Sequence, residues 1–151
     1  MAYLRMEDGM TVKQILDQKG RDVVTVNPSM GTEDAVRFLA DNKIGAVVVT
    51  GVGGKIAGIL SERDIVRAVA SKGADALTMP ISSIMTSKVT TCSETYTINQ
   101  VMEMMTNGRF RHLPVEENGM LVGIISIGDV VRRRIEDVER EAEEIKAYIA
   151  G

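Results

Sequence analysis

The chain has 151 residues, with 18 basic and 21 acidic side chains and a formal net charge of −3. This balance gives no global positive field to attract nucleic acid or anionic lipid. Aromatic residues are 3% of the chain and tryptophan is absent, so a stacking surface for single-stranded nucleic acid is poorly supplied. No apolar run approaches the roughly 20 residues of a membrane span. The single cysteine excludes an intramolecular disulfide and favours a cytoplasmic, reducing compartment.

The first part of the chain predicts one β-α-β-β-α unit. A short amphipathic segment at 12–16 opens it, and a strand follows at 23–26. A helix around 35–40 comes next and ends near Lys43. Two nearly continuous apolar runs flank a glycine-rich turn and predict a hairpin over 44–60, covered on both faces. A helix then begins at Ser61 and stops at Lys72-Gly73.

The second part predicts the same unit again. It opens at 81–85, and a strand follows at 89–92. Thr97 and Gln100 form a capping-box pattern before a helix that ends at Asn107-Gly108. The strands 112–115 and 120–125 flank Asn118-Gly119, a strong two-residue turn signal, and a closing helix begins at Ser126.

A nine-residue pattern shows the repetition directly. Gly58 to Val66 reads glycine, two aliphatics, serine, two variable residues, aspartate and two aliphatics, and Gly123 to Val131 reads the same. We therefore expect three parts: residues 1–80 as repeat one with its opening segment and linker, 81–135 as repeat two, and 136–151 as a charged helix. Each repeat alone buries only a marginal core, so the two should pack together in a mixed α/β (α+β) fold.

The carboxyl-terminal segment has a different pattern. Ile135, Val138, Ala142, Ile145 and Ile149 are spaced 3, 4, 3 and 4 residues apart between charged residues. This amphipathic stripe of about two heptads is too short to form a stable isolated coiled coil. We expect it to pack on the amino-terminal segment or on a second copy, with the charged residues on a solvated face.

The repeated Ser-x-x-Asp has two interpretations. Ser61 and Asp64 lie at a strand-to-helix junction, where free amides and the helix dipole favour phosphate, and a carboxylate can accept both hydroxyls of a ribose. Arg63 adds a cation beside them. The same serine and aspartate also make a plain N-terminal cap, and a duplication would copy caps as readily as sites.

Two such units in register resemble a tandem CBS-domain pair, also called a Bateman module, across roughly residues 12–135. The resemblance implies two repeats related by pseudo-two-fold symmetry and binding of an adenine nucleotide such as AMP, ADP, ATP or NAD(H), without catalysis. It implies that aspartate holds ribose, that the preceding serine lies near ribose and phosphate, and that early and second strands frame the adenine. The positions to which it assigns these roles are Val24, Thr25, Ile44, Gly45, Ala46, Ser61, Asp64, Thr90, Phe110, Arg111, His112, Ser126 and Asp129. Arg63 joins these candidate residues as the cation beside the first helix start.

The resemblance also implies that each site joins the aspartate of one repeat with early strands of the other, in the cleft between the repeats. Asp129 is then expected to act with Thr25, Gly45 and Ala46. Asp64 is expected to act with Thr90 and with the two basic residues Arg111 and His112. Because the basic groups gather there, we predict unequal affinities, with the Asp64 site the better one for phosphate.

Other chemistry has weaker support. His112, the only histidine, could be a base, a metal ligand or a satisfied strand residue, and Cys92 is best read as a packed thiol. No catalytic residue, metal ligand or required cofactor is predicted. The leading hypothesis is a regulatory nucleotide sensor that forms a four-repeat homodimer and acts on an unknown regulated protein. The alternative is an interaction scaffold whose nucleotide sites are vestigial.

Overall fold

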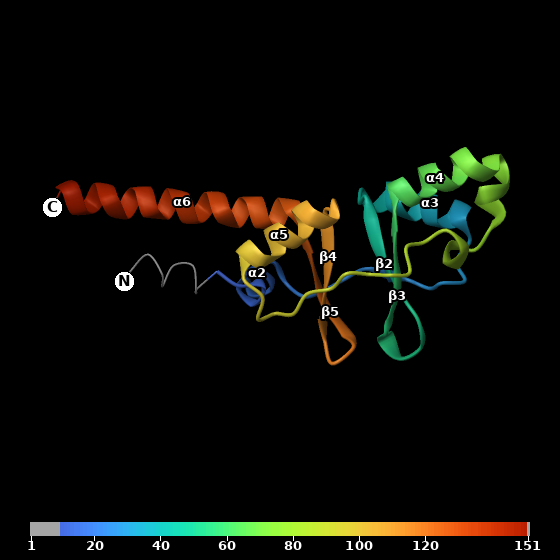
Figure 1. Ribbon diagram of the computed structural model, residues 1–151, viewed down its shortest axis with the longest axis horizontal. Helices are drawn as coiled ribbons and strands as arrows, with labels where there is room; N and C mark the ends of the chain where they lie inside the picture. The colour runs from blue at the N-terminus through green and yellow to red at the C-terminus, as the bar shows by residue number, and fades with distance from the viewer. Residues whose placement is uncertain (1–9, 151) are drawn as a thin grey trace. The chain divides into compact units, whose positions relative to one another are not determined.

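A computed structural model describes residues 10–150, so residues 1–9 and 151 of the predicted parts lie outside it. Figure 1 shows the elements in chain order. They are α2 (Val12–Lys19), β1 (Thr25–Val26), α3 (Thr32–Asn42), β2 (Ala46–Thr50), η1 (Val52–Gly54), β3 (Ile56–Ser61), α4 (Glu62–Lys72), η2 (Gly73–Thr78), η3 (Ile81–Ser83), α5 (Ile98–Gly108), β4 (His112–Glu117), β5 (Met120–Ser126) and α6 (Ile127–Ala150). The predicted mixed α/β class with a carboxyl-terminal helix is confirmed.

The chain forms two compact units whose opening segments are exchanged. Among the described residues, unit 1 holds 10–21, 92–115 and 123–150, and unit 2 holds 22–91 and 116–122. The segment that opens repeat one, α2, therefore belongs with the main body of repeat two, and the segment that opens repeat two belongs with the main body of repeat one. The division at residues 80 and 135 stays a prediction, to which the structure adds this exchange.

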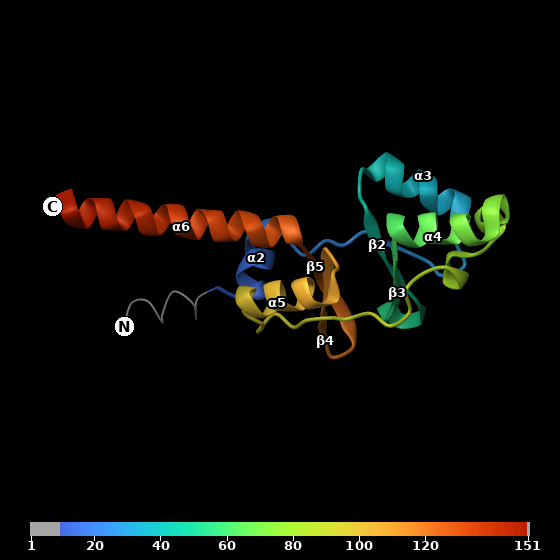
Figure 2. The ribbon, with the colours of Figure 1, turned by 45° about the horizontal axis from the view of Figure 1, so that its top comes forward.

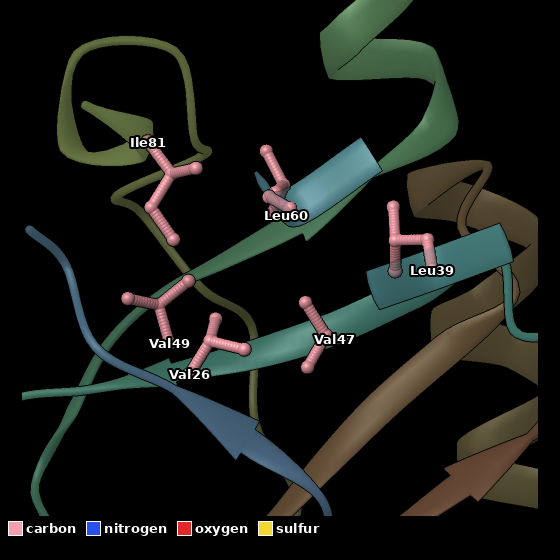
Figure 3. Close-up of a cluster of buried hydrophobic side chains, with 7 residues drawn as sticks. Val26, Leu39, Val47, Val49, Leu60 and Ile81 are labelled. Carbon is pink, nitrogen blue, oxygen red and sulfur yellow. The ribbon is translucent and has the colours of Figure 1, made fainter. Parts of the chain in front are cut away.

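Unit 2 is built on a three-stranded sheet in the order β1-β2-β3. Strand β1 pairs with β2 in parallel, and β2 pairs with β3 in antiparallel register with Val48 opposite Ile59. Figure 3 shows the apolar core on this sheet, which includes the fully buried Leu60 and Ile81. Ile81 comes from the opening segment of repeat two, so the exchanged segment completes this core.

The antiparallel hairpin β4-β5 is divided between the two units: residues 112–115 and 123–126 belong to unit 1, and the turn, within 116–122, belongs to unit 2. Its turn has positive φ at both Asn118 and Gly119, the geometry expected for an Asn-Gly turn. The prediction of a strand over 89–92 is wrong, because only Cys92 makes a bridge there, parallel to Val115. The amide of Cys92 donates to the Pro114 carbonyl, but the next donor needed to extend a parallel ladder would be Pro114 itself, which has no N–H.

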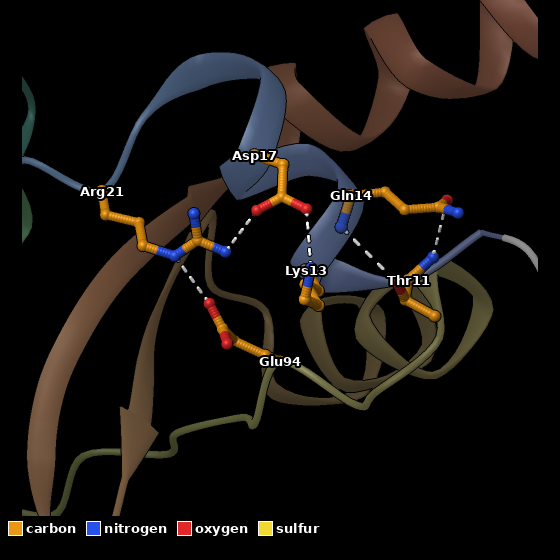
Figure 4. A network of polar contacts seen from close by, with 6 residues as sticks. All are labelled: Thr11, Lys13, Gln14, Asp17, Arg21 and Glu94. Atoms are coloured by element: carbon orange, nitrogen blue, oxygen red, sulfur yellow. Dashed lines mark hydrogen bonds and ion pairs between the residues drawn. The ribbon is translucent and has the colours of Figure 1, made fainter.

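Polar contacts fix α2 within unit 1, as Figure 4 shows. Thr11 and Gln14 form a capping box at the start of the helix. Asp17 accepts from Lys13 at 2.9 Å and from Arg21 at 2.6 Å, and Arg21 also donates to Glu94 at 2.8 Å. Exposed pairs of this kind add little stability each, but the chain of contacts joins α2 to the segment before α5.

Helix α6 is one unbroken helix of 24 residues. The predicted closing helix of repeat two and the predicted charged tail are therefore parts of a single element, with no break near residue 135. Figures 1 and 2 show its first turns beside α2 and α5, while its second half runs on without a described element beside it. No helix among residues 10–150 combines the length and apolar character that a membrane crossing needs.

Candidate functional site

The first Ser-x-x-Asp forms a complete capping box at the start of α4. The Ser61 Oγ accepts from the Asp64 amide at 3.2 Å, and Asp64 Oδ2 accepts from the Ser61 amide at 3.0 Å. The Ser61 hydroxyl also lies 3.1 Å from Asp64 Oδ2. Ser61 and Asp64 therefore cap α4, and the cap uses one oxygen of the Asp64 carboxylate.

The second oxygen of Asp64 meets a hydroxyl. Thr86 Oγ1 donates to Asp64 Oδ1 at 3.1 Å, and Asp64 is only 5% exposed. Arg67 lies 3.8 Å from the same oxygen, but its side chain is 71% exposed, so the ion pair is weak. Asp64 Oδ1 thus already accepts from an alcohol of a neighbouring segment, the kind of donor that a ribose offers.

The second Ser-x-x-Asp repeats the cap but has a different partner. Asp129 Oδ2 accepts from the Ser126 amide at 2.9 Å, and Ser126 Oγ accepts from the Asp129 amide at 3.1 Å. Lys19 donates to the same Asp129 Oδ2 at 2.7 Å and to the Ile124 carbonyl at 3.0 Å. This carboxylate is therefore held by an ammonium group, where Asp64 is held by a hydroxyl.

Lys19 and Thr86 are the residues that the sequence analysis missed. Both lie at the ends of opening segments, and each reaches the aspartate of the repeat that its segment does not open. The signal was present in the sequence as two similar segments, 12–19 and 81–88, placed before each repeat. Nothing in the sequence alone indicated that these segments change places.

Backbone bonds place the predicted adenine-framing residues beside each cap. The Glu62 amide donates to the Gly45 carbonyl at 3.0 Å, and the Ile127 amide donates to the Arg111 carbonyl at 2.8 Å. Each first helical amide is thus fixed by the residue just before β2 or β4. Within unit 2, Gly45 lies beside the start of α4, and within unit 1, Arg111 lies beside the start of α6.

The other predicted residues differ in what they can offer to a ligand. Ala46 is buried, so only its backbone is available, whereas Arg63 and Arg111 are exposed and their guanidinium groups are accessible. Three of the remaining predicted residues are exposed, namely Val24, Thr25 and Thr90. The other two, Ile44 and Phe110, are half-buried. The expected pairing of Asp64 with Arg111 and His112, and of Asp129 with Thr25 and Gly45, stays a prediction.

Burial shifts the pKa values of His112 and Asp129, two titratable groups of unit 1, in opposite directions. Burial lowers the pKa of His112, with Lys19 and Arg111 acting in the same direction and Asp129 against it. Burial also opposes ionisation of Asp129, but the Lys19 hydrogen bond and the Ser126 amide outweigh it and lower the pKa of this carboxyl. His112 is therefore mainly neutral at pH 7, and the positive charge beside Asp129 comes from Lys19.

These shifts predict a loss of stability on acidification in two steps. The His112 pKa lies below its usual 6.5 in the folded chain, so stability is full above 6.5 and falls as the pH drops through the folded value. Asp129 adds a second loss below about pH 3.8, because its pKa is lowered as well. Urea unfolding between pH 8 and 5 checks the first step. His112→Gln is expected to flatten that slope, and an unchanged slope would contradict the assignment.

Comparison with known proteins identifies the fold. A family model described as CBS domain matches residues 12–71 and 81–136. The chain belongs to the CBS domain family. The predicted resemblance is thereby confirmed, and the two matched stretches are a tandem CBS pair. CBS pairs are regulatory ligand-binding modules, typically without catalytic activity.

Sequence relatives of this CBS pair come from distant organisms. The mitochondrial CBS domain-containing protein CBSX3 of Arabidopsis thaliana is 30% identical over 159 residues, covering 97% of this chain and 77% of the relative. An uncharacterized 17.7 kDa protein of Acidianus ambivalens is 32% identical over 140 residues, covering 89% of this chain and 82% of the relative. The similarity thus extends over most of both chains.

Solved CBS structures share the fold. A CBS-domain containing protein of Agrobacterium tumefaciens is 55% identical with a TM-score of 0.79, covering 83% of this chain and 96% of that one. The CBS domain pair of protein MJ0100 is 26% identical with a TM-score of 0.72, covering 82% and 94%. That pair was solved in complex with 5′-methylthioadenosine and S-adenosyl-L-methionine.

Proposed function

We propose that this chain is a regulatory sensor of an adenine nucleotide such as AMP, ADP, ATP or NAD(H), bound at its Ser-x-x-Asp helix starts. The observation that carries the proposal is the Asp64 carboxylate, 5% exposed, with Oδ1 accepting from the Thr86 hydroxyl at 3.1 Å. A ribose hydroxyl can replace that alcohol and keep the bond, while the start of α4 favours phosphate. The adenosine compounds in the MJ0100 complex support this ligand class.

The two sites are proposed to differ in affinity. A ligand at Asp129 has to displace Lys19 from a 2.7 Å ion pair with a carboxylate whose side chain is 12% exposed. At Asp64 the ligand displaces only a neutral hydroxyl, which costs less because charge-assisted bonds are roughly twice as strong as neutral ones. This asymmetry supports the prediction that Asp64 marks the better site.

Binding is proposed to change the packing of the repeats and to signal to a separate regulated protein, without a catalytic step. A ligand that binds one arrangement better shifts the population toward it. We propose a homodimer of four repeats as the working unit. The single cysteine, Cys92, is buried, and a lone cysteine is consistent with the reducing cytoplasmic location expected from the sequence.

A second candidate function, an interaction scaffold, is favoured by one observation. Both capping boxes are formed entirely by residues of the chain, so helix capping alone accounts for Ser61, Asp64, Ser126 and Asp129. In that case the helix starts bind no nucleotide, and the chain acts only through its surfaces.

Thermal unfolding with and without ligands separates the two functions. We expect adenosine, AMP, ATP, NADH or S-adenosylmethionine to raise the midpoint, with GMP and GTP as matched controls that have little effect. A ligand at 100 times its Kd adds about 2.7 kcal/mol, which is a rise of about 5–10 °C for a domain of this size. If no adenosine compound moves the midpoint, the scaffold function is the correct one.

A further inference from the structure

The surface of α6 carries an exposed apolar stripe that the proposed binding sites do not use. Its members recur every three or four residues and are Val131, Ile135, Val138, Ala142, Ile145 and Ile149. The large ones are 45% to 78% exposed. This spacing is the a and d pattern of a coiled coil, with Ile135 and Ile149 at a and Val138 and Ile145 at d. We call these six residues the α6 stripe.

The described body of the protein uses another face of the same helix. Val130 is fully buried, and Arg133 and Asp137 have side chains that are 17% and 8% exposed. These three residues are spaced three and four positions apart, so they lie on one face of the helix. That face is rotated by about a quarter turn or more around the helix axis from the α6 stripe. Residues 10–150 therefore leave the stripe exposed along α6, although a row of apolar side chains in water favours burial.

The charged residues that flank the stripe specify how a second α6 would align. Arg134 and Glu141 occupy g positions, and Glu139 and Lys146 occupy e positions. In a parallel, in-register pair, each g residue faces the e residue five positions later on the partner. Arg134 then faces Glu139 of the partner subunit, and Glu141 faces Lys146 of the partner subunit. All of these contacts are attractive.

An antiparallel pair would bring like charges together. Packing a against d in that orientation pairs Ile135 with Ile145 of the partner subunit, and places equivalent e and g positions opposite one another. Glu139 and Glu141 would each then face their own counterpart, and Arg132 would face Lys146 of the partner subunit. Like-charge contacts of this kind are destabilising, so the sequence opposes this orientation.

We propose that the α6 stripe binds the same stripe of a second copy as a parallel, in-register, two-stranded coiled coil. Two strands suit it because the apolar seam is narrow and its e and g neighbours are charged. The body of the protein already starts the helix at Ile127, which removes the nucleation cost that makes a short isolated coil unstable. This inference takes the proposed homodimer further, but its tests measure subunit pairing, so it and ligand binding can fail separately.

A cysteine placed in the seam tests orientation and register in the full chain. Ala142→Cys puts equivalent a positions face to face only in the parallel, in-register pair, so mild oxidation is expected to give a disulfide-linked dimer. Ala147→Cys is the matched control, because it makes the same change five residues later on the opposite, exposed face. The native Cys92 is 3% exposed and should not compete. Equal linkage of both variants, or none at residue 142, would overturn the proposal.

Charge reversal tests the same pairing by mass. Sedimentation of the wild type should give a dimer, and Lys146→Glu should raise the dimer dissociation constant about fivefold or more, because Glu141 would face a glutamate in both symmetric contacts. In the antiparallel pair this change would tighten binding. The Glu141→Lys variant is expected to dimerise weakly on its own. Mixed with Lys146→Glu, it should restore dimerisation, because opposite charges then face each other in both contacts. A monomeric or trimeric wild type, or tighter pairing of Lys146→Glu, would refute the proposal.

Discussion

Asp64→Ala is expected to lower the affinity for the adenosine ligand about 10- to 100-fold. The substitution removes the carboxylate proposed to accept ribose hydroxyls, and charge-assisted bonds of this kind contribute about 1.5–3 kcal/mol. Asp129→Ala should lower the affinity less, because a ligand there has first to displace Lys19. Calorimetric titration of the folded variants measures both values. Equal affinities for Asp64→Ala and wild type would refute the site.

The same substitution also affects stability, so the binding result needs a control. Asp64 caps α4, and losing a cap costs about 0.5–2 kcal/mol. Gln100→Ala breaks the equivalent capping box of α5, formed with Thr97, far from either aspartate in sequence. It should lower the unfolding midpoint similarly while leaving ligand affinity unchanged. Asp64→Asn keeps the size of the side chain but removes its charge. It should therefore separate the contribution of the charge to ligand affinity from that of side-chain packing.

Gly58→Ala is expected to destabilise the chain by about 1–3 kcal/mol, lowering the thermal midpoint by about 3–10 °C. A Cβ at residue 58 would lie 2.7 Å from the Thr86 carbonyl oxygen and 2.8 Å from Met85 Sδ. That carbonyl accepts from the Ile59 amide at 2.9 Å, so the backbone cannot retreat without breaking the bridge between β3 and the exchanged segment.

The same substitution at two other glycines serves as a control for the loss of stability expected at Gly58. At Gly123 the added Cβ would lie 2.8 Å from Leu16 side-chain carbons, which can rotate, so Gly123→Ala should cost less than Gly58→Ala. At Gly128 the nearest atom is Ser126 Oγ at 3.6 Å, and alanine suits a helix better than glycine, so Gly128→Ala should be neutral or slightly stabilising. Thermal midpoints that fall in the order Gly128→Ala, Gly123→Ala, Gly58→Ala would support the close contact at Gly58. An unchanged midpoint for Gly58→Ala would contradict it.

Most of the fold could be predicted from the sequence because its signals are local. The Thr97 and Gln100 capping box, the Asn118-Gly119 turn and the stop at Lys72-Gly73 each depend on neighbouring residues only. The strand expected over 89–92 failed for a non-local reason, since its parallel partner includes Pro114. The single long α6 was missed because a change of hydrophobic pattern at residue 135 does not interrupt the helical backbone.

The candidate site was predictable to a similar extent. The duplicated Ser61-Asp64 and Ser126-Asp129 identified both helix starts. Their second partners, Thr86 and Lys19, could not be found, because each lies far along the chain from the aspartate that it contacts. The sequence counted His112 as a basic group, but its burial, which the sequence does not report, lowers its pKa and disfavours the charged form.

Because the opening segments are exchanged, the repeated segment of the sequence does not coincide with the compact unit of the structure. Val12 and Leu16 are fully buried in a body made mainly of repeat two, and Ile81 is fully buried in a body made mainly of repeat one. A fragment that ends at residue 80 would contain α2 without the unit that buries it. It would also lack Ile81, which belongs to the core of the remaining part of the fragment. Each repeat therefore supplies a buried segment to the unit built mainly from the other repeat. Dividing the chain between the repeats does not give two fragments that each contain a complete core.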